Sequence, residues 1–413
     1  PGVPDMTYVN EIVASAHDVN TLYAAFNNHK NGDFKPYILK STNLGKSWKS
    51  IANNLPERGS VYAIEEDHIE PNLIFVGTEF SLFASLDGGD YWKELNKGLP
   101  TVAVRDINIQ QRENDLVLAT FGRGFYIMDD YSALREFTKE LEEKEAHLFS
   151  VRDPFQYQQY SPIAASSTVS WLGPKGFQGE DFYLGENPKF GAAFTFYLKE
   201  KYKTLEETRK EEEKNKREAG ETVYYPTAEQ LEAEEKEEEP FLIFTIKDAN
   251  GEVIQDLHAG ALKGINRAYW DLTYPDVDQV RTNTSNPKTN LNSGIMVLPG
   301  MYSVQLSKSI NGEKTVLSEP VEFEVKSLEN QTLPSSNPEA MHAYHKELTK
   351  LSKSANSARN AFNEINDRLE YYQAAARIVK SESLTSMISE MEARLDEIRL
   401  KMFGNQIKNQ LEI

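Results

Sequence analysis

One eight-residue pattern occurs twice near the start of the chain, and it restricts the fold more than any other feature. Residues 41–48 read STNLGKSW and residues 85–92 read SLDGGDYW, so the second copy begins 44 residues after the first. A Leu-Pro pair follows each copy at the same distance, beginning at Leu55 and at Leu99. A repeat with matching flanks indicates one structural unit that the chain uses more than once.

Short apolar runs with the length of β-strands accompany each copy. Two matched pairs are Val61–Ile64 with Val102–Val104, and Leu73–Thr78 with Leu116–Thr120. Thr21–Phe26 is a run of the same kind one unit earlier. A period of about 40–45 residues with several short strands per unit is typical of the blades of a β-propeller. We therefore predict a multidomain, mainly β protein that begins with propeller blades.

We assign three blades to residues 1–137 and interpret them as the last blades of a propeller. The third unit reads FGRGFYIMDD over residues 121–130 and has no copy of the repeated pattern, which favours a closing position. Three blades cannot close a ring, because propellers have at least four. We therefore expect missing blades upstream of Pro1, or another chain, to complete the propeller.

The repeated pattern, Ser-x-Asp-x-Gly-x-x-Trp, is the Asp box. We expect its Asp side chain to accept backbone N–H groups in a hairpin turn, its Gly to supply a positive φ, and its Trp to pack between blades. The first copy has Asn43 where the second has Asp87, which keeps the acceptor oxygen and loses the charge. The residues predicted to have this structural role are Ser41, Asn43, Gly45, Trp48, Ser85, Asp87, Gly89 and Trp92.

These motifs together resemble a known family. Residues 76–80, VGTEF, precede the second Asp box, and FGRGFYIMDD follows it. In this region, residues 1–137, the chain is similar to bacterial sortilin-like (VPS10-type) BNR-repeat proteins, which are often labelled glycosyl hydrolases because of their Asp boxes. The resemblance implies a large secreted propeller protein with further modules, located outside the cell or in the cell envelope of a bacterium. It does not imply hydrolysis, because Asp boxes occur in binding proteins and in enzymes.

The middle of the chain is predicted to contain an ordered connector and a sandwich of β-strands. Residues 138–190 are assigned to the connector, because they carry many aromatic residues among Gly, Pro and Ser. Residues 191–330 are assigned to an Ig-like β-sandwich, which segments 264–271 and 299–304 resemble. The expected strands are Ala192–Leu198, Phe241–Ile246, Ala268–Thr273, Tyr302–Leu306 and Val321–Val325. Trp270 is expected in the core of this sandwich.

Two insertions interrupt the predicted sandwich. Residues 199–239 are dominated by Glu and Lys, so we expect one or two solvated helices there. Residues 275–299 are polar and rich in Asn, and loops of this length are often functional or mobile.

Residues 337–413 are predicted to form a helical hairpin, because apolar residues recur there at alternating spacings of three and four. The seam runs from Met341 to Val379 and, after a polar break, from Leu384 to Met402. The second seam is about half as long as the first, so it leaves the first half of the first helix uncovered. The apolar residues of that half are Met341, Tyr344, Leu348 and Leu351.

Soluble proteins seldom leave such a stripe bare, so we expect it to dock, preferably on residues 140–330 and otherwise on a missing C-terminal continuation or a partner chain. His342 and His345 are three residues apart and could share a metal ion. No further ligand is evident near them, so we interpret them as surface histidines and predict no metal site.

Composition excludes several functions. The formal net charge of −19 disfavours nucleic acid and anionic membranes as partners, since both are polyanions. The chain has no cysteine, which rules out disulfides, thiolate catalysis and zinc–sulfur sites. No apolar run is long enough to insert into a bilayer. The sequence contains no phosphate loop or serine-hydrolase motif, and we predict no cofactor.

A glycosidase usually needs two carboxylates on either side of one glycosidic bond. A sialidase needs an arginine cluster with a tyrosine–acid pair, and three blades do not supply this set. We therefore assign no catalytic residue. The carboxylates available on the predicted blades are Glu79, Asp106, Asp129 and Asp130, and the residues we expect on a ligand face are Glu79, Arg105 and Arg123.

Three functions remain after these exclusions. The leading hypothesis is a non-catalytic scaffold segment that binds a protein or peptide. The alternative is an exo-acting, sialidase-like glycoside hydrolase whose site lies mostly in upstream blades. A purely structural role in a cell-surface assembly is the third.

Overall fold

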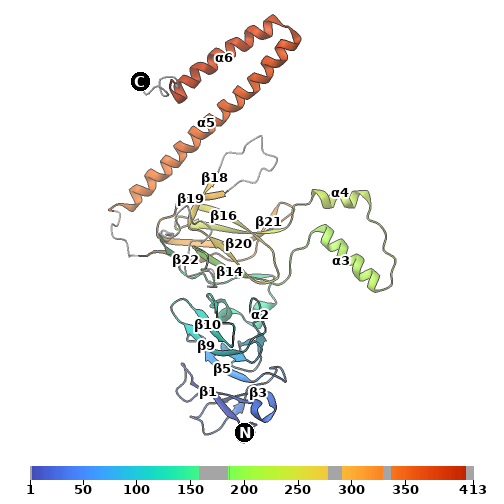
Figure 1. The fold of residues 1–413 in the computed structure, drawn as a ribbon, viewed down its shortest axis with the longest axis vertical. Coiled ribbons are helices and arrows are strands. Elements are labelled where there is room, and N and C mark those ends of the chain that lie inside the picture. The colour runs from blue at the N-terminus through green and yellow to red at the C-terminus, as the bar shows by residue number, and fades with distance from the viewer. Residues whose placement is uncertain (1, 158–184, 186, 278–290, 329–335, 406–413) are drawn as a thin grey trace.

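The computed structural model describes residues 2–157, 185, 187–277, 291–328 and 336–405. These residues form a mainly β protein with several antiparallel sheets and a C-terminal pair of helices. Three small sheets lie at the N-terminal end, a larger two-sheet unit occupies the middle, and the helices extend from the far side of that unit (Figure 1). Within the described residues, no helix is long and apolar enough to cross a membrane.

The first three sheets follow one another along the chain, and within each the strands pair antiparallel in sequence order. The first sheet contains β1 Tyr8–Ala14, β2 Leu22–Asn28, β3 Asp33–Ser41 and β4 Lys49–Ser50, with a short 3-10 helix at His29–Asn31. The second contains β5 Val61–Glu66, β6 Ile74–Thr78, β7 Leu82–Ser85 and β8 Lys93–Glu94. The third contains only β9 Val104–Gln110, β10 Asp115–Thr120 and β11 Phe125–Met128.

Apolar side chains fill the spaces between these sheets. Tyr23, Ile38 and Ile64 belong to a buried cluster shared by the first and second sheets, and Phe75 and Leu116 belong to one shared by the second and third. The sheets approach closely, because a Cβ atom at Gly77 would lie 2.7 Å from the carbonyl oxygen of Val104. Any side chain at position 77 would therefore force the second and third sheets apart.

The two Asp boxes form matching turns, one between β3 and β4 and one between β7 and β8. In the second, the Asp87 carboxylate accepts the N–H of Tyr91 at 2.8 Å, and the Ser85 hydroxyl accepts the N–H of Gly89 at 2.8 Å. In the first, Asn43 accepts the N–H of Ser47 at 2.9 Å in the same way. The amide oxygen of asparagine thus replaces the carboxylate without a change of turn geometry.

The two Asp-box tryptophans differ in burial. Trp92 is 2% exposed, because it packs against the segment that follows β4 of the preceding sheet. Trp48 is only partly buried. It lies next to Gly45 and Leu22 of its own sheet, and no earlier sheet covers it within the described residues. The expectation that both tryptophans pack between sheets therefore holds for Trp92 alone.

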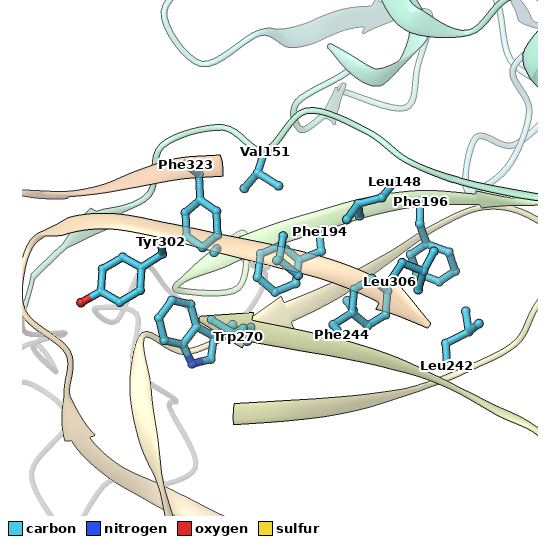
Figure 2. Close-up of a cluster of buried hydrophobic side chains, with 14 of the residues drawn as sticks. Leu148, Val151, Phe194, Phe196, Leu242, Phe244, Trp270, Tyr302, Leu306 and Phe323 are labelled. Carbon is cyan, nitrogen blue, oxygen red and sulfur yellow. The ribbon is translucent and has the colours of Figure 1, made fainter. Parts of the chain in front are cut away.

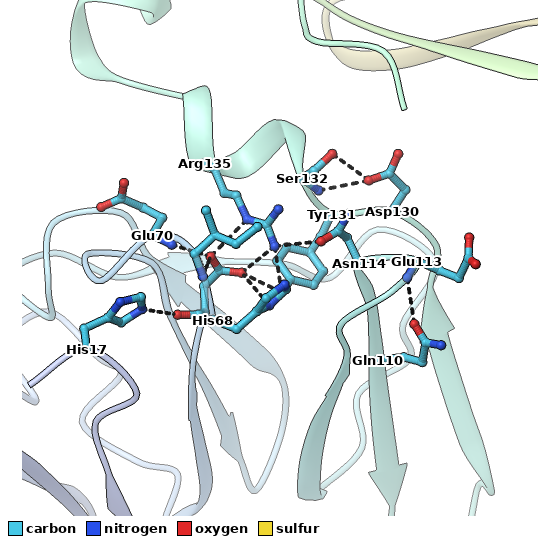
Figure 3. A network of polar contacts seen from close by, with 12 residues as sticks. His17, His68, Glu70, Gln110, Glu113, Asn114, Asp130, Tyr131, Ser132 and Arg135 are labelled. Atoms are coloured by element: carbon cyan, nitrogen blue, oxygen red, sulfur yellow. Dashed lines mark hydrogen bonds and ion pairs between the residues drawn. The ribbon is translucent and has the colours of Figure 1, made fainter. Parts of the chain in front are cut away.

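One buried carboxylate joins the second sheet to the segment that follows the third (Figure 3). Asp67, between β5 and β6, has no exposed side-chain surface and accepts two hydrogen bonds from Arg135, at 2.9 and 2.8 Å. The Tyr131 hydroxyl donates a third at 2.6 Å, and the N–H groups of Ile69 and Glu70 donate two more. Burial alone would raise the pKa of Asp67, but these donors hold it below its usual value.

Two short helices, α1 Ala133–Glu136 and α2 Lys139–Glu142, lead from the third sheet into the two-sheet unit. One sheet of that unit contains β12 Ala146–Leu148, β14 Ala192–Leu198 and β17 Gly264–Trp270. The other contains β13 Phe155–Gln156, β22 Val321–Ser327, β20 Gly300–Ile310, β15 Phe241–Asp248 and β16 Val253–Gly260, with β21 Glu313–Val316 paired to β20. β12 and β13 come from the stretch that we assigned to a connector, of which residues 158–184 and 186 lie outside the described residues.

The two sheets share one hydrophobic core (Figure 2). Phe194 stacks on Phe244 of the opposite sheet, with ring centroids 5.8 Å apart. Trp270 is 1% exposed, and its indole N–H donates to the Thr273 carbonyl at 3.0 Å. Trp270 is therefore a core residue, as we expected from the sequence.

The two insertions adopt different structures. The charged one forms α3 Leu205–Glu218 and α4 Ala228–Lys236, which have no buried residue and extend to the side of the two-sheet unit (Figure 1). This agrees with the prediction of solvated helices. The polar insertion is bounded by a pair of strands, β18 Thr273–Val277 and β19 Leu291–Met296, and is therefore not a simple loop throughout. Residues 278–290 of this insertion lie outside the described residues.

The C-terminal pair consists of α5 Pro338–Val379 and α6 Glu382–Phe403. Their contact buries Phe362, Leu369 and Ala376 on α5 against Ile388 and Leu395 on α6. As predicted, α6 covers only the second half of α5.

The first half of α5 keeps its apolar stripe exposed, since Met341, Tyr344, Leu348 and Leu351 are 45–67% exposed. The expectation that this stripe docks on residues 140–330 is wrong. The helix meets the β18–β19 pair through another face, on which His342 lies beside the Tyr274 ring and the Lys346 ammonium lies 4.1 Å from its centroid.

The Asp-box geometry leads to a stability prediction. Replacing Asp87 by Ala removes the acceptor of the Tyr91 N–H and the partner of the Ser85 hydroxyl, so we expect a loss of about 1–3 kcal/mol. Asp90→Ala, at an exposed neighbour in the same turn, is the matched control and is expected to change stability by less than about 0.5 kcal/mol. Urea denaturation measures both changes, and equal effects of the two substitutions would contradict the structural role of Asp87.

Candidate functional site

The rim opposite the Asp boxes carries most of the residues that we expected on a ligand face. Because consecutive strands run antiparallel, the β6–β7 and β10–β11 turns lie at the other end of the sheets from the Asp-box turns. Backbone hydrogen bonds tie this rim together: Val102 donates to Phe80 at 3.2 Å, and Phe121 donates to Ala103 at 2.9 Å. The turns of the second and third sheets therefore form one continuous surface.

Arg105 is the centre of this rim. Its guanidinium lies 3.9 Å from the centroid of the Tyr62 ring and 5.3 Å from that of Phe121. Burial raises the pKa of Tyr62, the positive charge of Arg105 lowers it, and the negative charge of Glu79 raises it, which places all three groups close together. Arg105 and Glu79 are thus both near the Tyr62 ring, and their place on a ligand face stays a prediction.

Two properties make this cluster suitable for binding. Phe121, beside the arginine, is 70% exposed, and Phe80 of the β6–β7 turn is 42% exposed, so the rim presents aromatic surface. The Glu79 Oε2 atom is buried and has no hydrogen-bond partner within the described part of the chain. A cation–π contact orients an arginine while leaving its N–H groups free to donate to a carboxylate or carbonyl of a ligand.

Arg123 is at the tip of the β10–β11 turn and is exposed. Gly122 and Gly124 on either side have φ angles of 79° and 70°, which permit the tight turn. No described interaction joins Arg123 to Arg105 or Glu79. It extends the positive charge of the rim and does not form part of the cluster.

Sequence reasoning missed a group of carboxylates on the first strands of the three sheets. Glu11 on β1, Glu65 on β5 and Asp106 on β9 are close enough to affect one another's ionisation. The pKa of Glu65 is raised to about 7, first by burial and further by the charges of Glu11, Asp106 and Glu66. Glu11 accepts the N–H of Ile64 at 2.8 Å, and burial raises its pKa as well.

The signal for this group was present in the sequence, because Glu65 and Asp106 lie just after the matched apolar runs Val61–Ile64 and Val102–Val104. Of the four carboxylates that we considered, only Asp106 belongs to it, and Glu79 lies on the rim. Asp129 and Asp130 follow β11 at the opposite end of the third sheet, where Arg267 of β17 donates to the Asp130 carbonyl. These four carboxylates therefore do not form one site.

The described residues contain no group of three or more acidic or histidine side chains arranged to hold a metal ion. His342, which we weighed as a ligand, instead lies beside Tyr274. Burial and the charges of Lys346 and His345 lower its pKa.

Comparisons with known proteins give only distant structural likenesses. No family model matches the sequence, and no curated protein matches it. A GH74 xyloglucanase from Xanthomonas campestris is 15% identical with a TM-score of 0.26, over 38% of this chain and 26% of that chain. YCF48 from Cyanidioschyzon merolae is 15% identical with a TM-score of 0.21, over 37% and 49%. Dimeric latent PorU from Porphyromonas gingivalis is 10% identical with a TM-score of 0.22, over 79% and 21%.

In each case the chain spans less than half of the length of the structure it matches. We base no assignment on likenesses of this size.

The raised pKa of the partly buried Glu65 leads to a prediction about pH. Since the pKa of Glu65 is raised on folding, its ionisation opposes folding, and stability falls as the pH rises from about 4.5 to about 7. Glu65→Gln keeps the shape and removes this charge, so we expect it to stabilise the protein by about 1–3 kcal/mol at pH 8. At pH 4.5 the gain should largely vanish. Denaturation at the two pH values measures the difference, and a gain that does not depend on pH would contradict the assignment.

Proposed function

We propose that residues 1–137 are three blades of an Asp-box β-propeller, and that the chain is a protein- or peptide-binding segment of a sortilin-like protein of the cell surface or cell envelope. Two four-stranded meanders with matching Asp-box turns support the propeller assignment. Completion of the ring by further blades, and an Ig-like identity for the two-sheet unit, are parts of the same proposal.

The single observation that supports binding at the rim is the arrangement of Arg105 between Tyr62 and Phe121, beside Glu79. Tyrosine and arginine are enriched among the residues that dominate protein–protein binding energy, and aromatic residues are enriched in interface cores. A ligand that covers this cluster buries the exposed ring of Phe121 and gains hydrogen bonds from Arg105. An extended peptide with an apolar and an acidic or carbonyl group matches these features.

A random peptide library displayed on phage and selected on the full chain tests this proposal. We expect enriched peptides to lose at least about tenfold in affinity for the double variant Arg105→Ala with Phe121→Ala. Lys263→Ala with Val253→Ala, on exposed parts of the two-sheet unit, is the matched control and should bind normally. Peptides that bind both double variants equally well would contradict a binding site on this rim.

One observation favours a second candidate, an exo-acting glycoside hydrolase. A carboxyl group whose pKa is raised towards neutrality, with a second carboxyl group nearby, is the arrangement that glycosidases use for general acid catalysis. Glu65 beside Glu11 and Asp106 matches this description. In this proposal Glu65 is the acid and Glu11 or Asp106 is its partner.

Assays with a panel of aryl glycosides and sialosides decide between the candidates. We expect no turnover by this chain. Turnover that Glu65→Gln abolishes, while Glu70→Gln in the following β5–β6 turn does not, would contradict the binding proposal and support the hydrolase.

A further inference from the structure

The two C-terminal helices contact each other through only part of their apolar surface. The buried residues recur every seven positions, at Phe362, Leu369 and Ala376 on α5 and at Ile388 and Leu395 on α6. A second apolar set keeps the same spacing three positions later, and its members are 44–66% exposed: Ile365, Tyr372, Val379, Leu384, Met391 and Ile398. Each helix therefore leaves half of its apolar seam outside the contact.

The exposed apolar residues of the two helices lie on the same side of the pair. In a helix, the residues three and four positions after a given residue lie on opposite sides of it. In an antiparallel pair, equal offsets on the two helices point to the same side. Arg399 of α6 donates to Asn366 of α5 at 3.3 Å, and each lies four positions after a buried residue, which marks the polar side. The exposed apolar residues therefore form one face on the other side.

This surface, which we call the hairpin face, consists of three pairs with one residue from each helix. The members of each pair are equally far in sequence from the junction of Ser381 and Glu382, so in an antiparallel hairpin they lie at the same level. The pairs are Val379 with Leu384, Tyr372 with Met391, and Ile365 with Ile398. A groove between two helices with apolar residues along both sides fits a third helix.

The near half of α5, residues 338–360, has apolar residues that no helix covers within the described part of the chain. Its contact with the β18–β19 pair uses His342 and Lys346 on another face, so the apolar stripe stays accessible. From Tyr344 to Ala358 the stripe spans 14 positions, which is also the span of the hairpin face on α5. Both surfaces are therefore about 21 Å long.

Charge also favours contact between these two surfaces. Histidines excluded, residues 338–360 contain two acidic and four basic residues, a net charge of +2. Residues 361–403 contain eight acidic and six basic residues, a net charge of −2. Contact between two near halves, or between two hairpin faces, would bring like charges together, whereas a near half on a hairpin face brings opposite charges together.

We infer that two copies of this chain associate through these helices, with the near half of α5 of each copy lying on the hairpin face of the other. The two α5 helices run antiparallel, and a two-fold axis passes between residues 361 and 362, so each copy makes the same contact with its partner. Three helices then pack together along the whole length of α5. One arrangement covers both apolar surfaces, which soluble proteins seldom leave bare. This association does not depend on the Arg105 rim.

Sedimentation velocity of the full chain tests the association. We expect a monomer–dimer equilibrium that Ile365→Glu with Met391→Glu weakens at least about tenfold, because these changes place charges in the apolar groove. Ile378→Glu with Leu400→Glu, at exposed apolar positions outside the hairpin face, is the matched control and should dimerise normally. A chain that stays monomeric at about 100 µM overturns the proposal, and so does a control that dissociates as readily as the groove variant.

A second double variant tests the other surface. Leu348→Glu with Leu351→Glu on the near half should weaken the dimer as much as the groove variant does, since both surfaces belong to one contact. Helix content measured by circular dichroism should stay unchanged. Arg105→Ala with Phe121→Ala should dimerise normally, which separates this association from binding at the rim. A dimer that tolerates the near-half changes contradicts the proposal.

Cysteine cross-linking tests the arrangement directly, because the chain has no cysteine of its own. Under mild oxidation, we expect Tyr372→Cys to form a disulfide-linked dimer when it is mixed with Leu351→Cys or with Leu348→Cys, one turn away. None of these variants should link to itself, because the two copies of each position lie about 30 Å or more apart and a disulfide needs Cα atoms within about 7 Å. Tyr372→Cys that links to itself, or mixtures that give no link, would overturn the proposal.

Discussion

A carboxylate without exposed surface must have its charge balanced and its oxygens hydrogen-bonded, and Asp67 meets this requirement with groups from distant parts of the chain. Arg135 and Tyr131 reach it from the segment after the third sheet, while the Asp67 carbonyl accepts from the His17 ring in the first sheet at 2.7 Å. Withdrawal of α1 would leave a buried charge without its cation, which costs several kcal/mol. The chain therefore leaves the three sheets at one fixed place. The two-sheet unit lies at the end of the sheets that carries the Asp-box turns.

The two ends of the sheets differ in how their polar groups are used. At the Asp-box end, polar groups are used in turns, in the Asp67 network and in contacts to the two-sheet unit, such as that between Arg267 and Asp130. At the opposite end, Arg105 is held by aromatic rings, and its N–H groups remain available. Between the ends, burial and neighbouring charges raise the pKa of Glu65 to about 7, and groups with shifted pKa values are found more often at functional sites than elsewhere.

The sequence predicted local features well and long-range contacts less well. The Asp-box turns follow from residue types within eight positions, and the helices follow from periodicity over many turns. Glu11 lies near Glu65, and Asp67 bonds to Arg135, because of how the sheets stack on one another. The spacing of residues along the chain does not reveal how sheets stack. The repeat could have suggested that Glu11 lies near Glu65, because it places β1, β5 and β9 side by side. The exposed stripe on α5 was mispredicted because the helix touches the β18–β19 pair through His342 and Lys346 instead.

The length of α5 sets how far the tip of the helical hairpin lies from the two-sheet unit. Its 42 residues rise about 1.5 Å each, so the helix is about 60 Å long and its far end stands well away from the two-sheet unit. Because α6 packs against only the far half of α5, the near half is a single helix. Its length sets the distance between the two-sheet unit and the tip of the hairpin. The near half of α5 thereby fixes the separation between the hairpin tip and the sheets. Insertion or deletion of seven residues in the near half would change that separation by about 10 Å. Seven residues make almost two full helical turns, so the tip would keep nearly the same orientation about the helix axis.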